Sequence, residues 1–219
     1  QCIQAIGQRN ETVVVFQVRD QPLGKPGVTV VRAGERAGHG GDGVGVVAGI
    51  HGGYEWNTIA LADELIAHLT LHPEIVPSDV TLYILRSLNP DGEARSRGPA
   101  GRANERGVDL NRNFPAGWQA DYSRAGCWSK GPITTGAGPA SEPETQALMQ
   151  FMWARRVDAL ISYHSAALGI FAGGQPPDPA SLSLAEAAAG VSDYSYPHVD
   201  TGCQYTGQLI DWASSIGIA

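Results

Sequence analysis

The sequence predicts an α/β fold in which a mixed, mostly parallel sheet is flanked by helices on both faces. Stretches rich in β-branched residues alternate with stretches of helical periodicity along most of the chain. In addition, residues 43–50 (GVGVVAGI) are apolar at nearly every position, which is typical of a strand buried on both faces. Strands of this kind that alternate with helices indicate a sheet covered by helices on two sides.

The individual elements are predicted from the period of the apolar residues and from turn residues. Strands are predicted at five apolar or β-branched stretches: 12–18, 27–34, 43–50, 80–88 and 157–165. Helices are predicted at four stretches: 59–69, 141–156, 181–190 and 206–217. The first helix has apolar residues at three- and four-residue steps and stops near Pro73, and the second opens with the capping-box pattern of Ser141 and Glu144.

Residues 89–139 form a long, glycine-rich stretch without clear periodicity. Loops of this length in a compact domain are usually functional, so this stretch is expected to carry part of a site. The full range 1–219 is long enough to bury a core, and we expect a single domain.

Composition excludes several classes of partner. The net charge of −7 and the pI near 5.3 argue against nucleic acid and against an anionic membrane surface. No apolar run approaches the roughly 20 residues that a membrane span needs.

Cys2, Cys127 and Cys203 lack C-x-x-C spacing and allow one disulfide or none. The cysteines, and a first residue other than Met, favour a secreted or periplasmic protein over a cytoplasmic one; oligomeric state is not indicated.

Candidate metal ligands follow two of the predicted strands. His51 comes directly after 43–50, and His164 lies near the end of 157–165, while Glu55 is four residues beyond His51. Ligands in open α/β sheets bind at the carboxyl ends of strands, and two histidines with one glutamate match a catalytic zinc site whose fourth position is open for water. Each histidine taken alone is more often structural, so the hypothesis depends on their combination.

Two rival sites are weaker. His68 and His72 lie four residues apart on a predicted helix, but they lack the glutamate of an H-E-x-x-H motif and are interpreted as surface residues. The chain also has no G-x-S-x-G motif, which disfavours a serine hydrolase of the α/β-hydrolase kind.

Several motifs, in order along the chain, resemble those of the zinc carboxypeptidases of the carboxypeptidase A type. They are HGGYEW at 51–56, NPDG at 89–92, GRANERGVDLNRNFP at 101–115, SEPE at 141–144 and YHS at 163–165. The resemblance covers the chain from about Val44 to its end. It implies one zinc ion per chain, held by His51, Glu55 and His164.

The resemblance also implies roles for residues of the long stretch. Asp109 would accept a ring N–H from a ligating histidine, and Arg102 would polarise the scissile carbonyl and stabilise the oxyanion. Asn111 and Arg112 would hold the free C-terminal carboxylate of a peptide substrate, because the planar guanidinium suits a carboxylate. In isolation, Arg102, Asp109 and Arg112 could equally be solvated charges or turn residues.

Specificity is implied by two further positions. Ile210 aligns with the floor of the side-chain pocket and favours apolar or aromatic C-terminal residues, whereas Asp211, one position away, would reverse this preference. Tyr205 is either the mobile tyrosine that closes over substrate or an ordinary loop residue.

The implied activity is hydrolysis of the C-terminal peptide bond by a metal-activated water. The alternatives are a murein-peptide amidase of the same fold and a non-catalytic peptide-binding protein. Two features depart from the family pattern. Three residues, rather than two, separate His51 from Glu55, and the general-base glutamate of the family would align beyond Ala219. We therefore expect a truncated or nicked chain that lacks the last strand, or an inactive relative.

Overall fold

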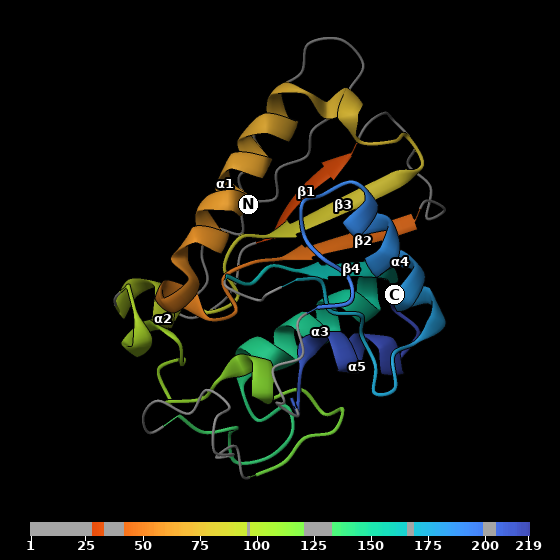
Figure 1. Cartoon of the computed structure of the whole chain (residues 1–219). Helices are drawn as coiled ribbons and strands as arrows, with labels where there is room; N and C mark the ends of the chain where they lie inside the picture. Colours follow the sequence, from red (N-terminus) through yellow and green to blue (C-terminus); the bar gives the residue numbers. More distant parts are fainter. Residues whose placement is uncertain (1–27, 33–41, 96, 121–132, 166–168, 199–204) are drawn as a thin grey trace.

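A four-stranded sheet with helices on both sides forms the centre of the molecule (Figure 1). The computed structural model describes residues 28–32, 42–95, 97–120, 133–165, 169–198 and 205–219. The strands are β1 (Val28–Arg32), β2 (Asp42–Val47), β3 (Val80–Leu85) and β4 (Val157–Ser162). The α-helices are α1 (Trp56–Leu71), α2 (Pro90–Arg95), α3 (Pro143–Arg155), α4 (Pro179–Gly190) and α5 (Leu209–Ser215). Four short 3₁₀ helices connect them: η1 (Gly52–Glu55), η2 (Pro73–Ile75), η3 (Pro99–Gly101) and η4 (Leu110–Arg112).

The sheet is mixed and mostly parallel, as predicted. Its strand order is β1-β3-β2-β4; β2 pairs in parallel with both β3 and β4, and β1 pairs antiparallel with β3. The carboxyl ends of β2 and β4 therefore lie side by side, with Val47 opposite Ser162. Residues that leave these two strands meet at one edge of the sheet.

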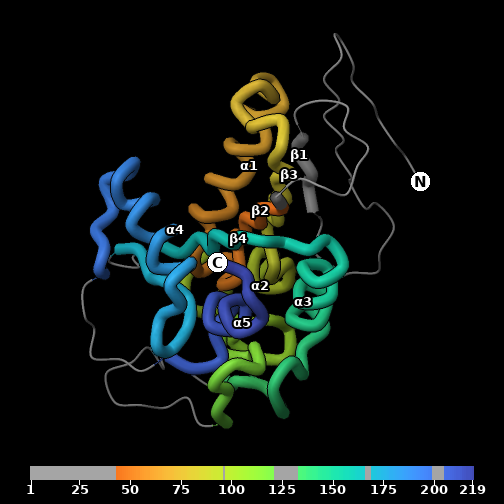
Figure 2. The backbone as a smooth tube through the Cα atoms, turned by 90° about the vertical axis from the view of Figure 1, so that its right-hand side faces the viewer, coloured from red at the N-terminus to blue at the C-terminus, as the bar shows by residue number. Residues whose placement is uncertain are grey.

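Two apolar cores lie on the two faces of the sheet, because successive residues of a strand point to opposite sides. Val46 and Ile84 pack towards α1, where Ala62 and Leu69 are buried. The neighbouring residues of the same strands face the other core, to which α3 and α5 contribute five buried side chains: Leu148, Met152, Leu209, Trp212 and Ala213. Figure 2 shows α1 and α3 on opposite sides of the strands. The prediction of helices on both faces is confirmed.

The capping box predicted at Ser141 is wrong. Helix α3 starts two residues later, with Glu142 in the N-cap position, Pro143 in the first turn, and no side-chain hydrogen bond to the cap. The Ser141 hydroxyl donates instead to Glu142 Oε1 at 2.8 Å, and Asn104 donates to Glu144 at 3.3 Å. The two residues of the expected box are therefore used in contacts with neighbouring side chains.

Ala219 lies against the outer side of β4. Its N–H donates to the carbonyl of Asp158 at 3.0 Å, and its own carbonyl accepts from Leu160 N–H at 2.8 Å. This is the hydrogen-bond pattern of a parallel strand. The predicted strand at 12–18 and the three cysteines, Cys2, Cys127 and Cys203, lie outside the described residues. Within the described parts, no helix is both long enough and apolar enough to cross a membrane.

Candidate active site

A tight turn after β2 places His51 and Glu55. The chain leaves the sheet at Gly49, whose φ of +61° suits a residue without Cβ; a Cβ there would lie 2.9 Å from Ser87 Cα. Gly49 N–H donates to the Thr58 hydroxyl at 3.1 Å, and that hydroxyl donates to the carbonyl of Glu55 at 2.8 Å. These two bonds connect the end of β2 to the start of α1, so the backbone on both sides of His51 is held.

The 3₁₀ helix η1 explains the three residues between His51 and Glu55. Gly52 has φ +43°, and a Cβ there would lie 2.7 Å from Glu93 N and 2.8 Å from the Gly101 carbonyl. The turn therefore packs directly on α2 and η3. Because α1 begins only at Trp56, Glu55 is directed back towards His51, and Oε1 lies 2.8 Å from His51 Nδ1. The longer spacing keeps the two side chains in contact.

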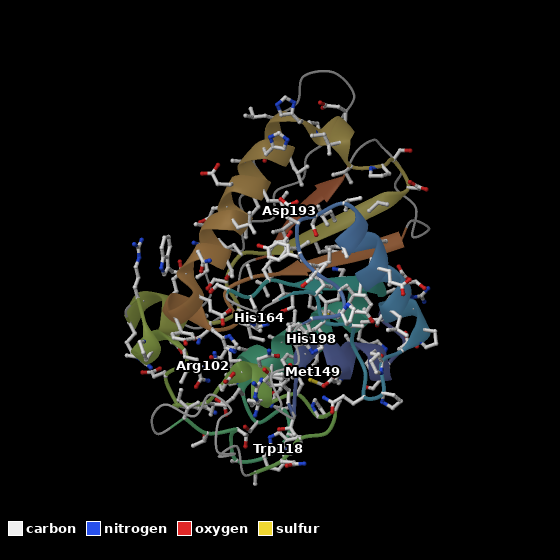
Figure 3. All side chains as sticks on the ribbon, in the orientation of Figure 1. Arg102, Trp118, Met149, His164, Asp193 and His198 are labelled. Atoms are coloured by element: carbon white, nitrogen blue, oxygen red, sulfur yellow. The ribbon has the colours of Figure 1, made fainter. Side chains whose placement is uncertain are left out.

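His51, Glu55 and His164 converge at the edge of the sheet where β2 and β4 end. His164 Nδ1 lies 3.0 Å from Glu55 Oε2, and the two imidazole rings are 4.9 Å apart. Figure 3 places His164 and Arg102 at this same end of the molecule. The ligand atoms of the three side chains all lie within 4.8 Å of one another. Among the described residues, no other group of three or more His, Cys, Asp or Glu has this geometry.

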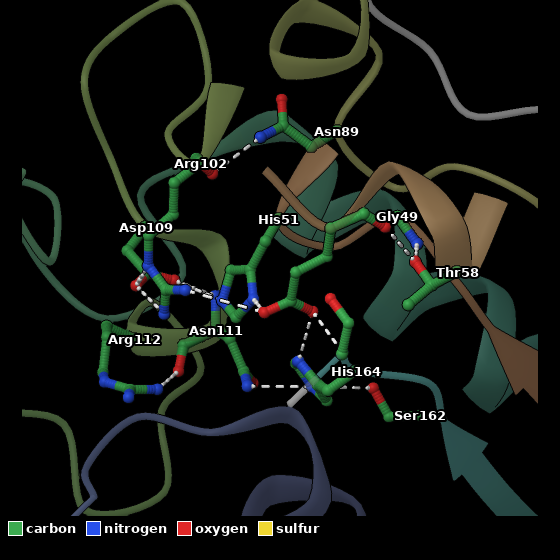
Figure 4. A network of polar contacts seen from close by, with 12 residues as sticks. Gly49, His51, Thr58, Asn89, Arg102, Asp109, Asn111, Arg112, Ser162 and His164 are labelled. Carbon is green, nitrogen blue, oxygen red and sulfur yellow. Dashed lines mark hydrogen bonds and ion pairs between the residues drawn. The ribbon is translucent and has the colours of Figure 1, made fainter. Parts of the chain in front are cut away.

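Asp109 and Arg102 form the next layer of the site (Figure 4). Asp109 is fully buried, and its Oδ1 lies 3.1 Å from His51 Nε2. Arg102 donates to Asp109 Oδ2 through Nε at 2.9 Å, and its Nη2 lies 2.8 Å from the same oxygen. Its Nη1 is 3.8 Å from Glu55 Oε1. The guanidinium is thus anchored on one side and directed towards the histidine and glutamate group on the other.

The NPDG motif positions Arg102. Asn89 donates through Nδ2 to the Arg102 carbonyl at 3.0 Å (Figure 4). Its Oδ1 accepts from Gly92 N–H at 2.8 Å. A Cβ on Gly92 would collide with the Gly101 carbonyl. The first turn of α2 therefore lies directly against the segment that carries the arginine. The sequence alone indicated no structural role for Asn89, although an Asn directly before Pro is a usable signal of an N-cap.

Asn111 and Arg112 follow Asp109 on η4, and both are buried. Asn111 Nδ2 lies 3.3 Å from His164 Nε2, so this side chain borders the histidine directly. The Arg112 guanidinium donates to the Asn111 carbonyl at 2.6 Å, and its central carbon lies 5.2 Å from the centre of the Tyr205 ring. The structure thus places Asn111 beside His164, and Arg112 beside Asn111 and Tyr205.

The position of Tyr205 depends on backbone contacts of its loop. Gly207 donates to the Ala116 carbonyl at 3.1 Å and accepts from Phe114 N–H at 3.0 Å. A Cβ on Gly207 would collide with the Arg112 carbonyl. The segment before α5 therefore packs closely on the segment that carries the buried arginine.

Ile210 and Asp211 lie on α5 in different surroundings. The backbone carbonyl of Ile210 packs against Gly173, where a Cβ would lie 2.6 Å away. Asp211 is buried and accepts three hydrogen bonds: from Gly174 N–H at 3.0 Å, from Gln175 Nε2 at 2.7 Å and from Gln208 Nε2 at 3.1 Å. Its carboxylate is therefore already occupied by neutral donors from this chain.

Neighbouring charges lower the pKa of both Asp109 and Glu55. Burial alone would raise the pKa of Asp109, but the charges of Arg102 and His51 hold this pKa well below its ordinary value. Burial also opposes ionisation of Glu55, and the contacts with His51 and His164 nevertheless lower its pKa. Burial lowers the pKa of His164, and its bond to Glu55 only partly offsets this effect. A neutral histidine beside an ionised carboxylate is the protonation state that a metal ligand needs.

The rival pair behaves as surface residues. His68 and His72 stand 4.9 Å apart at the exposed end of α1, and His72 Nδ1 lies 3.3 Å from the exposed Glu74. Sequence reasoning also missed Ser162, whose hydroxyl lies 3.4 Å from His164 Nε2. A serine at the end of a strand carries no signal of function by itself, so this contact could not be predicted from the sequence.

Comparison with known proteins agrees with this arrangement. The family model described as zinc carboxypeptidase (peptidase M14) matches residues 9–217. Murein peptide amidase A of Escherichia coli (strain K12) is 34% identical over 125 residues, covering 54% of this chain and 47% of the relative. Human carboxypeptidase O is 28% identical over 165 residues, covering 64% of this chain and 44% of the relative. The crystal structure of thrombin activatable fibrinolysis inhibitor superposes with a TM-score of 0.67 at 23% identity, covering 88% of this chain and 55% of that chain. The chain therefore spans less than half the length of the two curated relatives.

Proposed function

Because this chain belongs to the zinc carboxypeptidase family, we propose that it binds one zinc ion and hydrolyses the C-terminal peptide bond of peptides with a free carboxylate. The observation that supports this proposal most strongly is the convergence of His51 and Glu55, from the turn after β2, with His164, from the end of β4. Two arginines are buried near these ligands: Arg102 lies 3.8 Å from Glu55, and Arg112 donates to the carbonyl of Asn111, whose side chain borders His164. Such a site offers metal ligands and anion-binding groups to one substrate.

The three candidate ligands suit zinc chemically. Two imidazole nitrogens and one carboxylate leave the fourth tetrahedral position open, as catalytic zinc sites do. Bonds of about 2.0–2.2 Å in a tetrahedral site place ligand atoms roughly 3.3–3.5 Å apart. The Nδ1 atoms of His51 and His164 lie 2.8 and 3.0 Å from the two oxygens of Glu55, so a small outward movement of the side chains would accommodate the ion.

The proposed roles follow from where each side chain is held. When bound, zinc supplies Lewis-acid chemistry: it lowers the pKa of water to about 7 and polarises a carbonyl oxygen. With zinc bound, Asp109 would accept the Nε2–H of His51, which would leave the Nδ1 lone pair for the ion. Arg102, which Asp109 holds through Nε and Nη2, would place its remaining N–H groups near the oxygen that gains negative charge during attack.

Arg112 and Asn111 would bind the terminal carboxylate. Arg112 is 4% exposed and lies beside the Tyr205 ring, so a carboxylate there would be held in a site with little water. A charge-assisted contact from a guanidinium is stronger in such surroundings than at an exposed position. If binding requires a free terminal carboxylate at Arg112 and Asn111, only the last peptide bond can reach the metal ligands, and cleavage would be restricted to that bond.

Apolar or aromatic C-terminal residues are the proposed preference. The alternative depended on Asp211 as a partner for a basic side chain, but three N–H groups of the chain already bind its carboxylate. A single salt bridge would have to replace three hydrogen bonds to this carboxylate, and hydrogen bonds to charged groups contribute about 1.5–3 kcal/mol each.

A murein-peptide amidase is the second candidate, and the 34% identity with murein peptide amidase A supports it. Both activities hydrolyse an amide bond and would use the same zinc ligands. They differ in the substrate residue that must fit beside the carboxylate clamp, by which we mean Arg112 and Asn111. Panels of ordinary peptides and of murein-derived peptides therefore separate the two activities.

Zinc content and product analysis test the proposal together. Purified protein should contain one zinc per chain and release the last residue from peptides with free carboxylates. His164→Ala should lose both zinc and activity, whereas His68→Ala, at the exposed end of α1, should retain both. Faster cleavage of murein-derived peptides than of any ordinary peptide would favour the amidase. Zinc and peptide binding without any product would instead support a binding protein, and a full zinc content in His164→Ala would refute the assigned ligands.

A further inference from the structure

The side-chain amide of Asn111 has a fixed orientation. Its Oδ1 accepts a hydrogen bond from the backbone N–H of Leu209 at 2.9 Å, and a backbone N–H can only donate. The Nδ2 group therefore faces His164 Nε2, 3.3 Å away (Figure 4). Because an amide NH₂ group also only donates, Nε2 must present its lone pair in this arrangement.

The protonation of His164 follows from that contact. When Nε2 carries the lone pair of a neutral imidazole, the proton is on Nδ1. Nδ1 lies 3.0 Å from Glu55 Oε2, an acceptor, so the two contacts of the ring agree. The structure therefore holds His164 in the Nδ1–H tautomer.

Metal binding requires the other tautomer. Nδ1 is the ring atom that faces Glu55, and His51 also directs its Nδ1 towards that carboxylate. A ligating nitrogen must be deprotonated, so the proton of His164 has to move to Nε2. There the Asn111 NH₂ group cannot accept it. The Ser162 hydroxyl, 3.4 Å from Nε2, can accept it.

Ser162 lies close to His164 in both sequence and structure, which suits this role. It is the last residue of β4, opposite Val47 at the carboxyl ends of the two strands, and it lies two residues before His164, which follows the strand. His51 has a different partner, because a buried carboxylate, Asp109, lies at its Nε2. The two histidines therefore depend on different groups for the orientation of the ring.

We propose that Ser162 is a positioning residue that holds His164 in its metal-binding tautomer, and that this exchange releases the Asn111 amide to bind the substrate carboxylate. The inference depends on the proposed zinc site and clamp. It links the two: with zinc bound, the proton of His164 would be on Nε2 and not on Nδ1, Nε2–H would donate to Ser162 Oγ, and Asn111 Nδ2 would lose its acceptor. The freed N–H then lies beside Arg112, where the carboxylate would bind.

Zinc affinity of the full chain, measured by competition with a chelator, tests the role of Ser162. Loss of a hydrogen-bond partner of a ligating histidine typically weakens metal binding by about 10- to 100-fold, and we expect about tenfold for Ser162→Ala. Ser162→Thr keeps a hydroxyl and should restore most of the affinity. Ser165→Ala is the matched control, because Ser165 contacts Glu55 through its backbone N–H. Equal affinity in Ser162→Ala and wild type would overturn the role of Ser162.

The tautomer itself can be observed by long-range ¹H–¹⁵N NMR of the histidine rings. The His164 signal, assigned by its absence from His164→Gln, should report Nδ1–H in protein stripped of metal and Nε2–H after zinc is added. An Nε2–H tautomer in the stripped protein would overturn the exchange with Asn111. If wild type bound no zinc at all, the proposed function would fail first, and the two failures are thereby distinguished.

Discussion

His51 Nε2 lies 3.1 Å from Asp109 Oδ1, while Nδ1 of the same ring lies 2.8 Å from Glu55 Oε1. One imidazole thus connects two carboxylates that differ in surroundings. Asp109 is fully buried and is also bound by Arg102, whereas Glu55, also buried, contacts the second histidine, His164, at 3.0 Å. The ring orientation depends on Asp109, and the chemistry depends on the atom that faces Glu55.

Asp109→Asn should therefore weaken zinc binding and stability together. The amide can no longer provide two negatively charged oxygens to His51 and Arg102, so zinc affinity should fall by about 10- to 100-fold. Breaking one partner out of a buried ion pair typically costs about 3–5 kcal/mol of unfolding free energy. Chelator competition and urea denaturation measure the two effects.

Asp63→Asn is the matched control for that variant. Asp63 also binds an arginine, with Arg86 Nε at 2.7 Å, but both side chains are largely exposed. Exposed pairs contribute about 0–1 kcal/mol, so this variant should unfold at nearly the wild-type urea concentration and bind zinc normally. Similar losses of stability in both variants would argue that burial of Asp109 is not the cause.

Arg112→Ala tests the carboxylate clamp. A lost hydrogen bond to a charged group costs about 1.5–3 kcal/mol, so kcat/KM on peptides with a free C-terminal carboxylate should fall about 10- to 100-fold, mainly through KM. Arg112→Lys should recover part of the loss, because it keeps the charge without the planar fork. C-terminally amidated peptides, cleaved slowly by both proteins, should be nearly unaffected. Equal losses on both kinds of substrate would exclude a clamp for the terminal carboxylate.

Much of the fold could be predicted because its signals are local. The apolar run at 43–50 became the central strand β2 and the turn after it, and the spacing of Ile59, Ala62 and Leu69 became the buried face of α1. The start of α3 could not be predicted in the same way. Ser141 and Glu144 have the residue types of a capping box, but Asn104, which binds Glu144, is distant in sequence. A local pattern does not reveal such a tertiary contact.

The candidate site, like the fold, could be predicted from the sequence only in part. The types and order of His51, Glu55 and His164 indicated a metal centre, and the structure brings them together. The spacing after His51 could not be interpreted from sequence, because the 3₁₀ turn η1 depends on the close packing of Gly52 against α2 and η3. The contact between Ser162 and His164 was also overlooked, since serine in a strand carries no signal of function by itself.

Gly52→Ala should destabilise the protein and disturb the metal centre. The added Cβ would lie 2.7 Å from Glu93 N, and the φ of +43° is unfavourable for alanine. Backbone strain of this kind costs about 1–3 kcal/mol, and the clash adds to it. Thermal denaturation should show a clear decrease in Tm, with weaker zinc binding because Glu55 lies at the end of the same turn. Gly138→Ala, where a Cβ would meet nothing within 4 Å, should change Tm little; a comparable decrease there would remove the argument from packing.

Glu144 provides a prediction about pH. Burial raises its pKa above the ordinary value of 4.5, and the charges of Asp91 and Glu142 act in the same direction, although its own backbone N–H and Asn104 oppose them. A carboxyl group whose pKa is higher in the folded state binds its proton more tightly there than in the unfolded state. Ionisation of Glu144 therefore reduces stability. This loss is complete above the folded pKa and disappears as the pH falls below 4.5.

Glu144→Gln removes the loss of stability that ionisation causes. The variant retains a side-chain oxygen that can accept from Asn104 Nδ2, which lies 3.3 Å from Glu144 Oε1 in the wild type. The variant should have a higher Tm than wild type at neutral pH, because neither buried carboxylate repulsion nor desolvation of a charge opposes folding. The difference in Tm should shrink as the pH falls through the raised pKa and vanish below 4.5. Glu105→Gln removes the same charge from an exposed position on the neighbouring turn and should have little effect at any pH. Calorimetric scans of the three proteins across this range would decide the question, and a Tm for Glu144→Gln that is lower than wild type at neutral pH would show that the ionised carboxylate stabilises the start of α3.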